Sequence, residues 1–143
     1  MNKPILVLRQ SSVLPYRLTQ GTVEVMLITS IKRQQWIIPK GWIAPGLSAA
    51  DSAAKEAWEE AGVTGRVLTP AIATYTAQKW GYPCRRDVFL LHVETALEDW
   101  LEAKQRKRQW LSLTEATKHV KGKALKRLFT KLQADPDLFQ QDE

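Results

Sequence analysis

Apolar and polar positions along the chain predict several short strands and three helices. Residues 23–29 and 36–38 are rich in apolar and β-branched side chains, which favours strands joined by the polar residues 30–35. Residues 5–9 are a further candidate for the same sheet. Strands and helices mixed in this order are compatible with an α/β protein.

The middle of the chain predicts two longer strands. Residues 63–76 alternate loosely around Pro70, which indicates one or two strands with an interruption. Residues 79–83 predict a turn, and residues 86–95 carry an apolar run typical of a buried strand. We expect these segments to form a hairpin, and residues 109–113 to form a last short strand after a polar loop.

The first predicted helix begins near Ala49, with Ser48 as its N-cap, and ends at Gly62 in a left-handed conformation. Its alanines favour close packing, with Trp58 as the large anchor.

Two more helices are predicted near the end of the chain. Thr114 is the expected N-cap of the first, and residues 122–132 carry the apolar side of the second. We expect residues 134–143 to fray.

A loop rich in glycine and proline, residues 39–47, precedes the first helix and is expected to lack regular structure.

The first helix carries three carboxylates on one face, because Glu56, Glu59 and Glu60 are spaced i, i+3 and i+4. Like charges at this spacing destabilise an isolated helix, so a compensating cation is expected. Oxygen ligands favour Mg²⁺ or Mn²⁺.

Length and composition favour a single domain, residues 1–143, with a core at about residues 3–133. The chain has 143 residues, of which 44% are hydrophobic, enough for one core. Cys84 is the only cysteine, so an internal disulfide and a thiolate-rich zinc site are excluded. Because no apolar run is long enough for a signal or a membrane span, a cytoplasmic location without membrane contact is expected.

The net charge of +6 predicts attraction to phosphates. A basic surface is also compatible with nucleic acid or with simple solvation. The phosphates could belong to a small ligand, to nucleic acid or to an anionic lipid surface. Nucleic acid is not favoured, because no aromatic array for base stacking is evident in the sequence; a small polyphosphate is the partner that the resemblance described next implies.

The segment from Gly41 to Val63 resembles the Nudix box, whose pattern is a glycine, five residues, Glu, seven residues and then Arg-Glu-aliphatic-any-Glu-Glu-any-Gly-aliphatic. Spacing through Glu56, the later glutamates and Gly62 is preserved. Two positions differ, because Leu47 replaces the first Glu and Lys55 the Arg. In the family these two brace the loop against the helix, so their loss bears on loop rigidity more than on metal binding.

Further segments are similar to the diphosphoinositol polyphosphate phosphohydrolase branch of the family, which also hydrolyses diadenosine polyphosphates. These are 36–41, 57–63, 97–100 and 107–110. The resemblance implies an α/β/α sandwich with a mixed sheet and divalent-metal-dependent hydrolysis of a phosphoanhydride bond.

The resemblance also implies roles for individual residues. Glu56 and Glu59 are the expected catalytic residues, with the general base left open. Metal ligands would be Glu56, Glu59, Glu60, the main-chain carbonyl of Lys40 and, as a further candidate, Glu98. Substrate-binding candidates are Arg85, Arg86, Lys107, Arg108, Arg17, Gly41 and Trp42.

Two other interpretations stay open. Leu47 and Lys55 are compatible with a catalytically degenerate domain that binds nucleotide or RNA, and the basic carboxy-terminal helix is compatible with an RNA 5′-pyrophosphohydrolase. His92, Cys84 and the tryptophans Trp36, Trp58, Trp100 and Trp110 are expected to be structural or incidental. The oligomeric state and the substrate are not specified by the sequence.

Overall fold

A strand that is buried on both faces runs through the middle of the sheet in the computed structural model, which describes residues 6–140. This strand is β1 (Leu8–Thr19). The predicted strand at 5–9 overlaps only its first residues, and Ile5 lies outside the described part. Polar residues misled the prediction, because Gln10, Ser11 and Ser12 are all buried.

The strands form a mixed sheet, as predicted. Their order is β3 (Trp36–Ile37), β2 (Thr22–Thr29), β1, β6 (Tyr82–Ala96) and β5 (Val63–Lys79). Two short strands lie off this path, β4 (Lys40–Trp42) against β1 and β7 (Arg108–Ser112) against β2. The pair β1 and β6 is parallel, whereas the other pairs are antiparallel.

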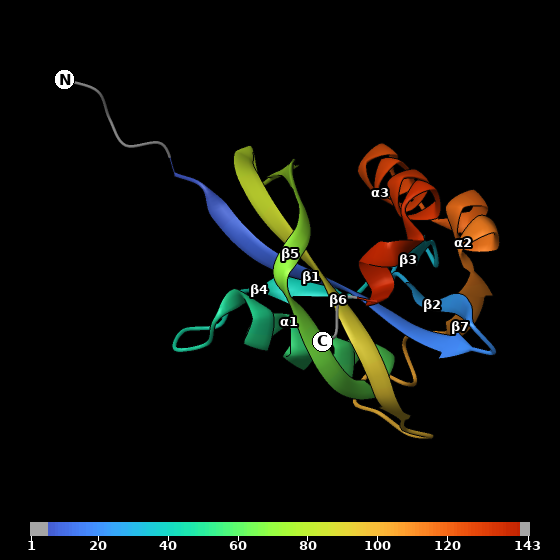
Figure 1. Cartoon of the computed structure of the whole chain (residues 1–143). Helices are drawn as coiled ribbons and strands as arrows, with labels where there is room; N and C mark the ends of the chain where they lie inside the picture. The colour runs from blue at the N-terminus through green and yellow to red at the C-terminus, as the bar shows by residue number, and fades with distance from the viewer. Residues whose placement is uncertain (1–5, 141–143) are drawn as a thin grey trace.

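Helices cover both faces of the sheet and complete the predicted α/β/α sandwich (Figure 1). On one face, α1 (Ala49–Glu56) continues as a turn of π-helix (Ala57–Ala61) and ends at Gly62, whose φ of 68° is left-handed as predicted. The other face carries α2 (Leu113–His119), α3 (Lys123–Ala134) and a 3₁₀ helix (Pro136–Gln140).

Each helical layer has its own hydrophobic core. Under α1, the small residues Ala53, Ala57 and Ala61 pack with Val13 and Met26. Because alanine side chains are short, the helix lies close to the sheet, and this brings its carboxylates near the sheet edge. The second core, under α2 and α3, contains larger side chains such as Tyr16, Phe129 and Phe139.

Several predicted boundaries were wrong. Ser112, not Thr114, caps α2, because its hydroxyl accepts the N–H of Glu115 at 3.2 Å. The 39–47 loop contains the short strand β4. Strand β5 runs through Pro70, and its register with β6 shifts between Leu68 and Ala73, which agrees with the predicted interruption. Trp58 is 46% exposed and does not anchor the helix.

The 3₁₀ helix at Pro136–Gln140 is packed rather than frayed. The Tyr16 hydroxyl donates to the main-chain oxygen of Phe139 at 2.9 Å, and the side chain of Phe139 is buried. The predicted fraying is therefore wrong for the 3₁₀ helix, while residues 141–143 lie outside the described part. Within residues 6–140, no helix is long and apolar enough to cross a membrane.

Candidate active site

Two carboxylates from the end of the first helix lie against the short strand β4. A Cβ atom added to Gly41 would lie 2.3 Å from the carboxylate carbon of Glu56, so only glycine leaves room for this group. One residue earlier, the main-chain N–H of Lys40 donates to Oε1 of Glu60 at 3.2 Å. The glycine-rich loop and the helix therefore meet at Glu56 and Glu60.

These two carboxylates are buried close together, and their pKa values show it. Glu56 and Glu60 are each 8% exposed. Burial raises the pKa of Glu56, and the charge of Glu59 raises it further against the opposing effect of Lys55. Burial also raises the pKa of Glu60 to about 7; Arg106 opposes this, and Glu56 adds to it. A pair of buried like charges is stabilised by a cation, so this donor set fits one.

Glu59 is paired with a lysine on the same helix. Its Oε1 accepts a hydrogen bond from Nζ of Lys55 at 2.7 Å. Among the described residues, no three acidic, histidine or cysteine side chains are placed to enclose a metal ion. Two carboxylates are still compatible with Mg²⁺, because this ion keeps several waters and often takes only one or two protein carboxylates.

Arg106 is the cationic neighbour that the sequence predictions missed. Its side chain, 10% exposed, pairs with Glu60 at 3.4 Å and with Glu102 at 2.7 Å, and it donates to the main-chain oxygen of Thr29 at 3.0 Å. Glu102 also raises the pKa values of Glu56 and Glu60. Glu98 was expected to complete the site, but its side chain is exposed. Glu102 is the loop carboxylate that lies beside the pair formed by Glu56 and Glu60.

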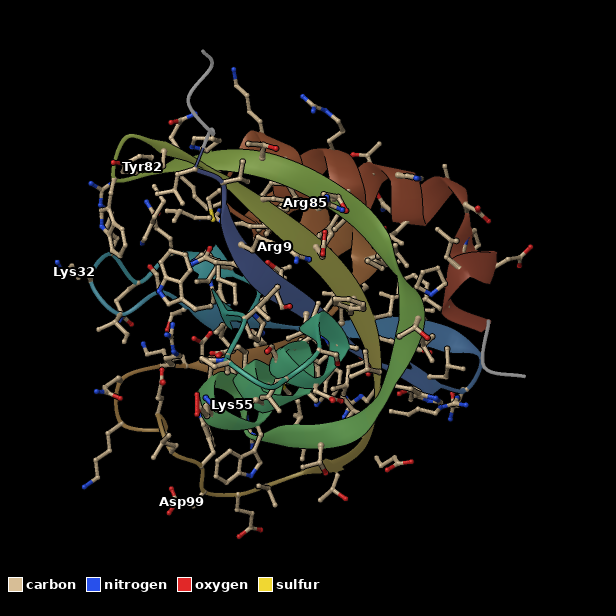
Figure 2. The ribbon with its side chains drawn as sticks, turned by 90° about the vertical axis from the view of Figure 1, so that its left-hand side faces the viewer. Arg9, Lys32, Lys55, Tyr82, Arg85 and Asp99 are labelled. Carbon is tan, nitrogen blue, oxygen red and sulfur yellow. The ribbon has the colours of Figure 1, made fainter. Side chains whose placement is uncertain are left out.

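Three hollows meet at the side chain of Lys40. The carboxylate cleft, about 530 Å³, is lined by Gln10, Lys40, Gly41, Trp42, Ile43, Ala44, Pro45, Lys55, Glu56, Glu60 and Lys79. The loop cleft, about 470 Å³, is lined by Ser30, Ile31, Lys32, Arg33, Gln35, Ile37, Lys40, Glu60, Lys79 and Arg106. Figure 2 labels Lys55 and Lys32, which line the first and second cleft.

The third hollow, the basic pocket, holds about 240 Å³ and lies beside the start of α3. Its lining includes four cationic side chains, those of Lys40, Arg86, Lys121 and Lys123. Burial lowers the pKa of Lys40, and Arg86 lowers it further, whereas Glu60 raises it. Crowded positive groups of this kind are suited to phosphate.

Comparison with known proteins agrees with this geometry. The NUDIX domain model matches residues 8–132. The chain belongs to the Nudix family. It is 31% identical to Nudix hydrolase 12, mitochondrial, of Arabidopsis thaliana, over 74% of this chain and 63% of the relative. It is 36% identical to diphosphoinositol polyphosphate phosphohydrolase 2 of Rattus norvegicus, over 66% of this chain and 53% of the relative.

The fold is similar to that of a solved hydrolase. The crystal structure of C. elegans Ap4A hydrolase aligns with a TM-score of 0.72 at 23% identity, covering 90% of this chain and 98% of that one. The predicted resemblance and fold are thereby confirmed. The chain spans only about half to two thirds of the length of the curated relatives named above.

The two neighbouring arginines of β6 point in opposite directions in this Nudix domain. Arg86 lines the basic pocket, and its Nε donates to Oε1 of Gln10 at 2.8 Å. Arg85 faces the other side of the sheet, as adjacent strand residues do, where its Nε lies 3.2 Å from Asp87 near Arg9 (Figure 2). The structure therefore does not place Arg85 with Arg86 in the basic pocket.

Arg108 was also expected to bind substrate, but its guanidinium is committed to the backbone. It donates to the main-chain oxygens of Ala61 at 2.8 Å and Gly62 at 3.3 Å and to that of Leu97, and it lies 4.0 Å from the centre of the Trp100 ring. These carbonyls lie at and just beyond the helix end, where donors are needed. Arg108 thus caps the helix that carries the carboxylates.

The other two basic candidates, Lys107 and Arg17, do not line any of the three hollows. Lys107 is exposed, and its main-chain N–H and oxygen pair with Thr29. Arg17 pairs with Glu24 at 2.8 Å and lies 4.2 Å from the centre of the Trp110 ring. Because β1 pairs with Lys40 at Ser12, Arg17 lies five residues, or about 16 Å, further along that strand.

Two serines hold the loop and the start of α1, where the Glu–Arg pair is missing. The N–H of Ala44 donates to the Ser52 hydroxyl at 3.1 Å, and the Ser11 hydroxyl donates to the main-chain oxygen of Ala49 at 2.6 Å. Leu47 is 39% exposed and provides no such support. One hydrogen bond therefore holds the loop on α1, and the other holds the start of α1 on β1.

Proposed function

We propose that this Nudix domain hydrolyses a phosphoanhydride bond in a highly anionic substrate, either a diphosphoinositol polyphosphate or a dinucleoside polyphosphate. The observation that carries the proposal is the buried pair Glu56 and Glu60, packed on the bare backbone of Gly41 beside a cluster of cationic side chains. The names of the relatives, a diphosphoinositol polyphosphate phosphohydrolase and an Ap4A hydrolase, agree with this substrate class.

A divalent cation, Mg²⁺ or Mn²⁺, would be held by Glu56 and Glu60, with Glu59 and the main-chain carbonyl of Lys40 as additional ligands. When bound, it neutralises charge on the nonbridging phosphate oxygens and makes water more acidic. Glu59 would first have to leave Lys55, a change that an exposed ion pair opposes only weakly.

The chain's own side chains would divide the remaining work. Water attacks phosphorus, the bond to the bridging oxygen breaks, and the leaving phosphate keeps its electron pair. A carboxylate accepts the proton of the attacking water, with Glu56 as the first candidate and Glu59 as the second. Lys40, Arg86, Lys121 and Lys123 would hold the flanking phosphates.

Arg106 would act on the site through Glu60. Its ion pair favours the charged form of that carboxylate, which is the form that binds a cation. The same guanidinium ties the 97–107 loop to β2 through Thr29. Arg106 is therefore a positioning residue rather than a catalytic one.

The direct test is hydrolysis of both substrate classes by the purified protein, with and without Mg²⁺, and with identified products. Glu56→Gln, Glu59→Gln and Glu60→Gln should each lower turnover, whereas Glu98→Gln should match the wild type because Glu98 is exposed. Full turnover by Glu59→Gln, or hydrolysis that ignores Mg²⁺, would sink the proposal.

A second candidate is a binding domain without turnover, for nucleotide or RNA. The arrangement that favours it is the pair formed by Lys55 and Glu59, together with Leu47 at the position of the first Glu. Ligand-dependent thermal stabilisation without metal-stimulated hydrolysis would support it. Adding 5′-triphosphorylated RNA to the substrate panel tests the RNA pyrophosphohydrolase alternative, and a cytoplasmic location stays a prediction.

A further inference from the structure

Two tryptophans form an exposed aromatic pair beside the carboxylate cleft. Trp42 is 41% exposed and Trp80 is 74% exposed, yet their ring centroids lie only 5.5 Å apart with a tilt of 34°. Tryptophan is among the residues that gain most from burial. A pair left this open is suited to a ligand that covers it.

Both tryptophans are held by the elements that build the site. Trp42 ends β4, immediately after Gly41, and lines the same cleft as Glu56 and Glu60. Trp80 lies in the turn between β5 and β6, where its φ of 55° is left-handed, a conformation uncommon for a bulky residue. Two segments far apart in the sequence thus bring these indoles together.

A cation connects the pair to the phosphate-attracting surface. Nζ of Lys79 lies 5.4 Å from the centre of the Trp80 ring, and Lys79 lines both clefts that border Glu60. The ligand that matches this layout has a flat aromatic ring at one end and phosphates at the other. A nucleotide has both parts, because its base presents a π-face that stacks on indole.

The inositol ring offers no such face. It is saturated, and its carbons carry hydroxyl or phosphate groups, so it would leave both indoles uncovered. We propose that Trp42 and Trp80 form a stacking platform for a nucleobase, so that the domain selects nucleoside polyphosphates over diphosphoinositol polyphosphates. This inference rests on the proposed function for its phosphate site. It also supplies the aromatic surface that the sequence predictions found absent.

The first test is binding, measured by tryptophan fluorescence with ATP and with inorganic tripolyphosphate, in EDTA and in Mg²⁺. Stacking on an aromatic side chain should make ATP bind about 5- to 150-fold more tightly than tripolyphosphate. Trp80→Leu should reduce that ratio to near one. Tyr82→Leu is the matched control, because Tyr82 is an exposed aromatic of the same hairpin outside the indole pair.

The second test is kcat/KM for a dinucleoside polyphosphate and for a diphosphoinositol polyphosphate. The wild type should favour the dinucleotide, and Trp80→Leu should reduce that preference about as much as it reduces the binding ratio. Equal binding of ATP and tripolyphosphate, or a ratio unchanged by Trp80→Leu, would overturn the platform. Tryptophan-dependent nucleotide binding without any hydrolysis would support the platform while the proposed function failed.

Two other occupants would also overturn it. Dimerisation in sedimentation experiments that Trp80→Leu abolishes would assign the indoles to a second copy of the chain. Tryptophan-dependent binding of 5′-triphosphorylated RNA without binding of ATP would assign them to an RNA chain.

Discussion

Gly41→Ala should separate the stability of this domain from its metal chemistry. The added Cβ would lie 2.3 Å from Cδ and Oε2 of Glu56 and 2.6 Å from Oε1, so the carboxylate must move. It lies at the end of a flexible side chain and can swing away without moving the backbone. Gly41 is not among the described residues with positive φ, so alanine itself is tolerated there.

The expected sizes of the two effects differ widely. Replacing glycine by alanine in a permitted conformation stabilises a protein by about 0.4–1 kcal/mol, and moving Glu56 relieves its crowding with Glu60. The metal-free free energy of unfolding should therefore stay within about 1 kcal/mol of the wild type. Metal-dependent turnover should fall by at least about 10- to 100-fold, the cost of disturbing even an indirect partner of a metal ligand.

Urea unfolding in EDTA, Mg²⁺-dependent thermal stabilisation and turnover measure the two effects separately. Gly65→Ala is the contrasting variant, because its Cβ would meet the main-chain oxygen of His92 at 2.0 Å and backbone cannot swing aside. It should lose about 1–3 kcal/mol or more of stability. The double variant Gly41→Ala, Glu56→Gln should turn over substrate no more slowly than the slower single variant, because both changes act through one carboxylate. Wild-type turnover by Gly41→Ala would refute the reasoning.

Three further predictions concern the structural supports. Arg108→Met should lower the free energy of unfolding by about 1–3 kcal/mol, because three main-chain carbonyls lose their donor, and KM should not change. A raised KM at unchanged stability would instead support the predicted role of Arg108 in substrate binding. Phe139→Ala should cost about 3–5 kcal/mol in denaturant unfolding, and a negligible loss would mean that the chain end contributes no packing. Burial raises the pKa of Glu60 to about 7 in the folded protein, against a usual pKa of 4.5. The metal-free free energy of unfolding should therefore fall as the pH rises from about 4.5 to 7, by at most about 3 kcal/mol. Glu60→Gln should abolish that part of the fall, and Mg²⁺ should oppose it; an identical pH profile in wild type and Glu60→Gln would contradict it.

Local sequence patterns determined most of the helices and strands of this domain. Helical periodicity placed the three carboxylates on one helix, and Ser48 and Gly62 limit that helix because cap conformations depend on one or two residues. Strand patterns located most of the sheet. They failed at residues 10–12, because these polar side chains are buried although polar residues look exposed in a sequence; those of Gln10 and Ser11 find partners across the fold.

Only the tertiary structure decided which charges meet. Arg106, Lys107 and Arg108 are consecutive, yet one pairs with Glu60, one is exposed and one caps the helix. Likewise, Glu102 rather than Glu98 lies beside the carboxylates, and Trp42 meets Trp80 across 38 positions of the sequence. Such contacts depend on how strands and loops are brought together and on which face each side chain occupies. The sequence by itself therefore determined the carboxylate frame, and packing determined which cationic and aromatic groups surround it.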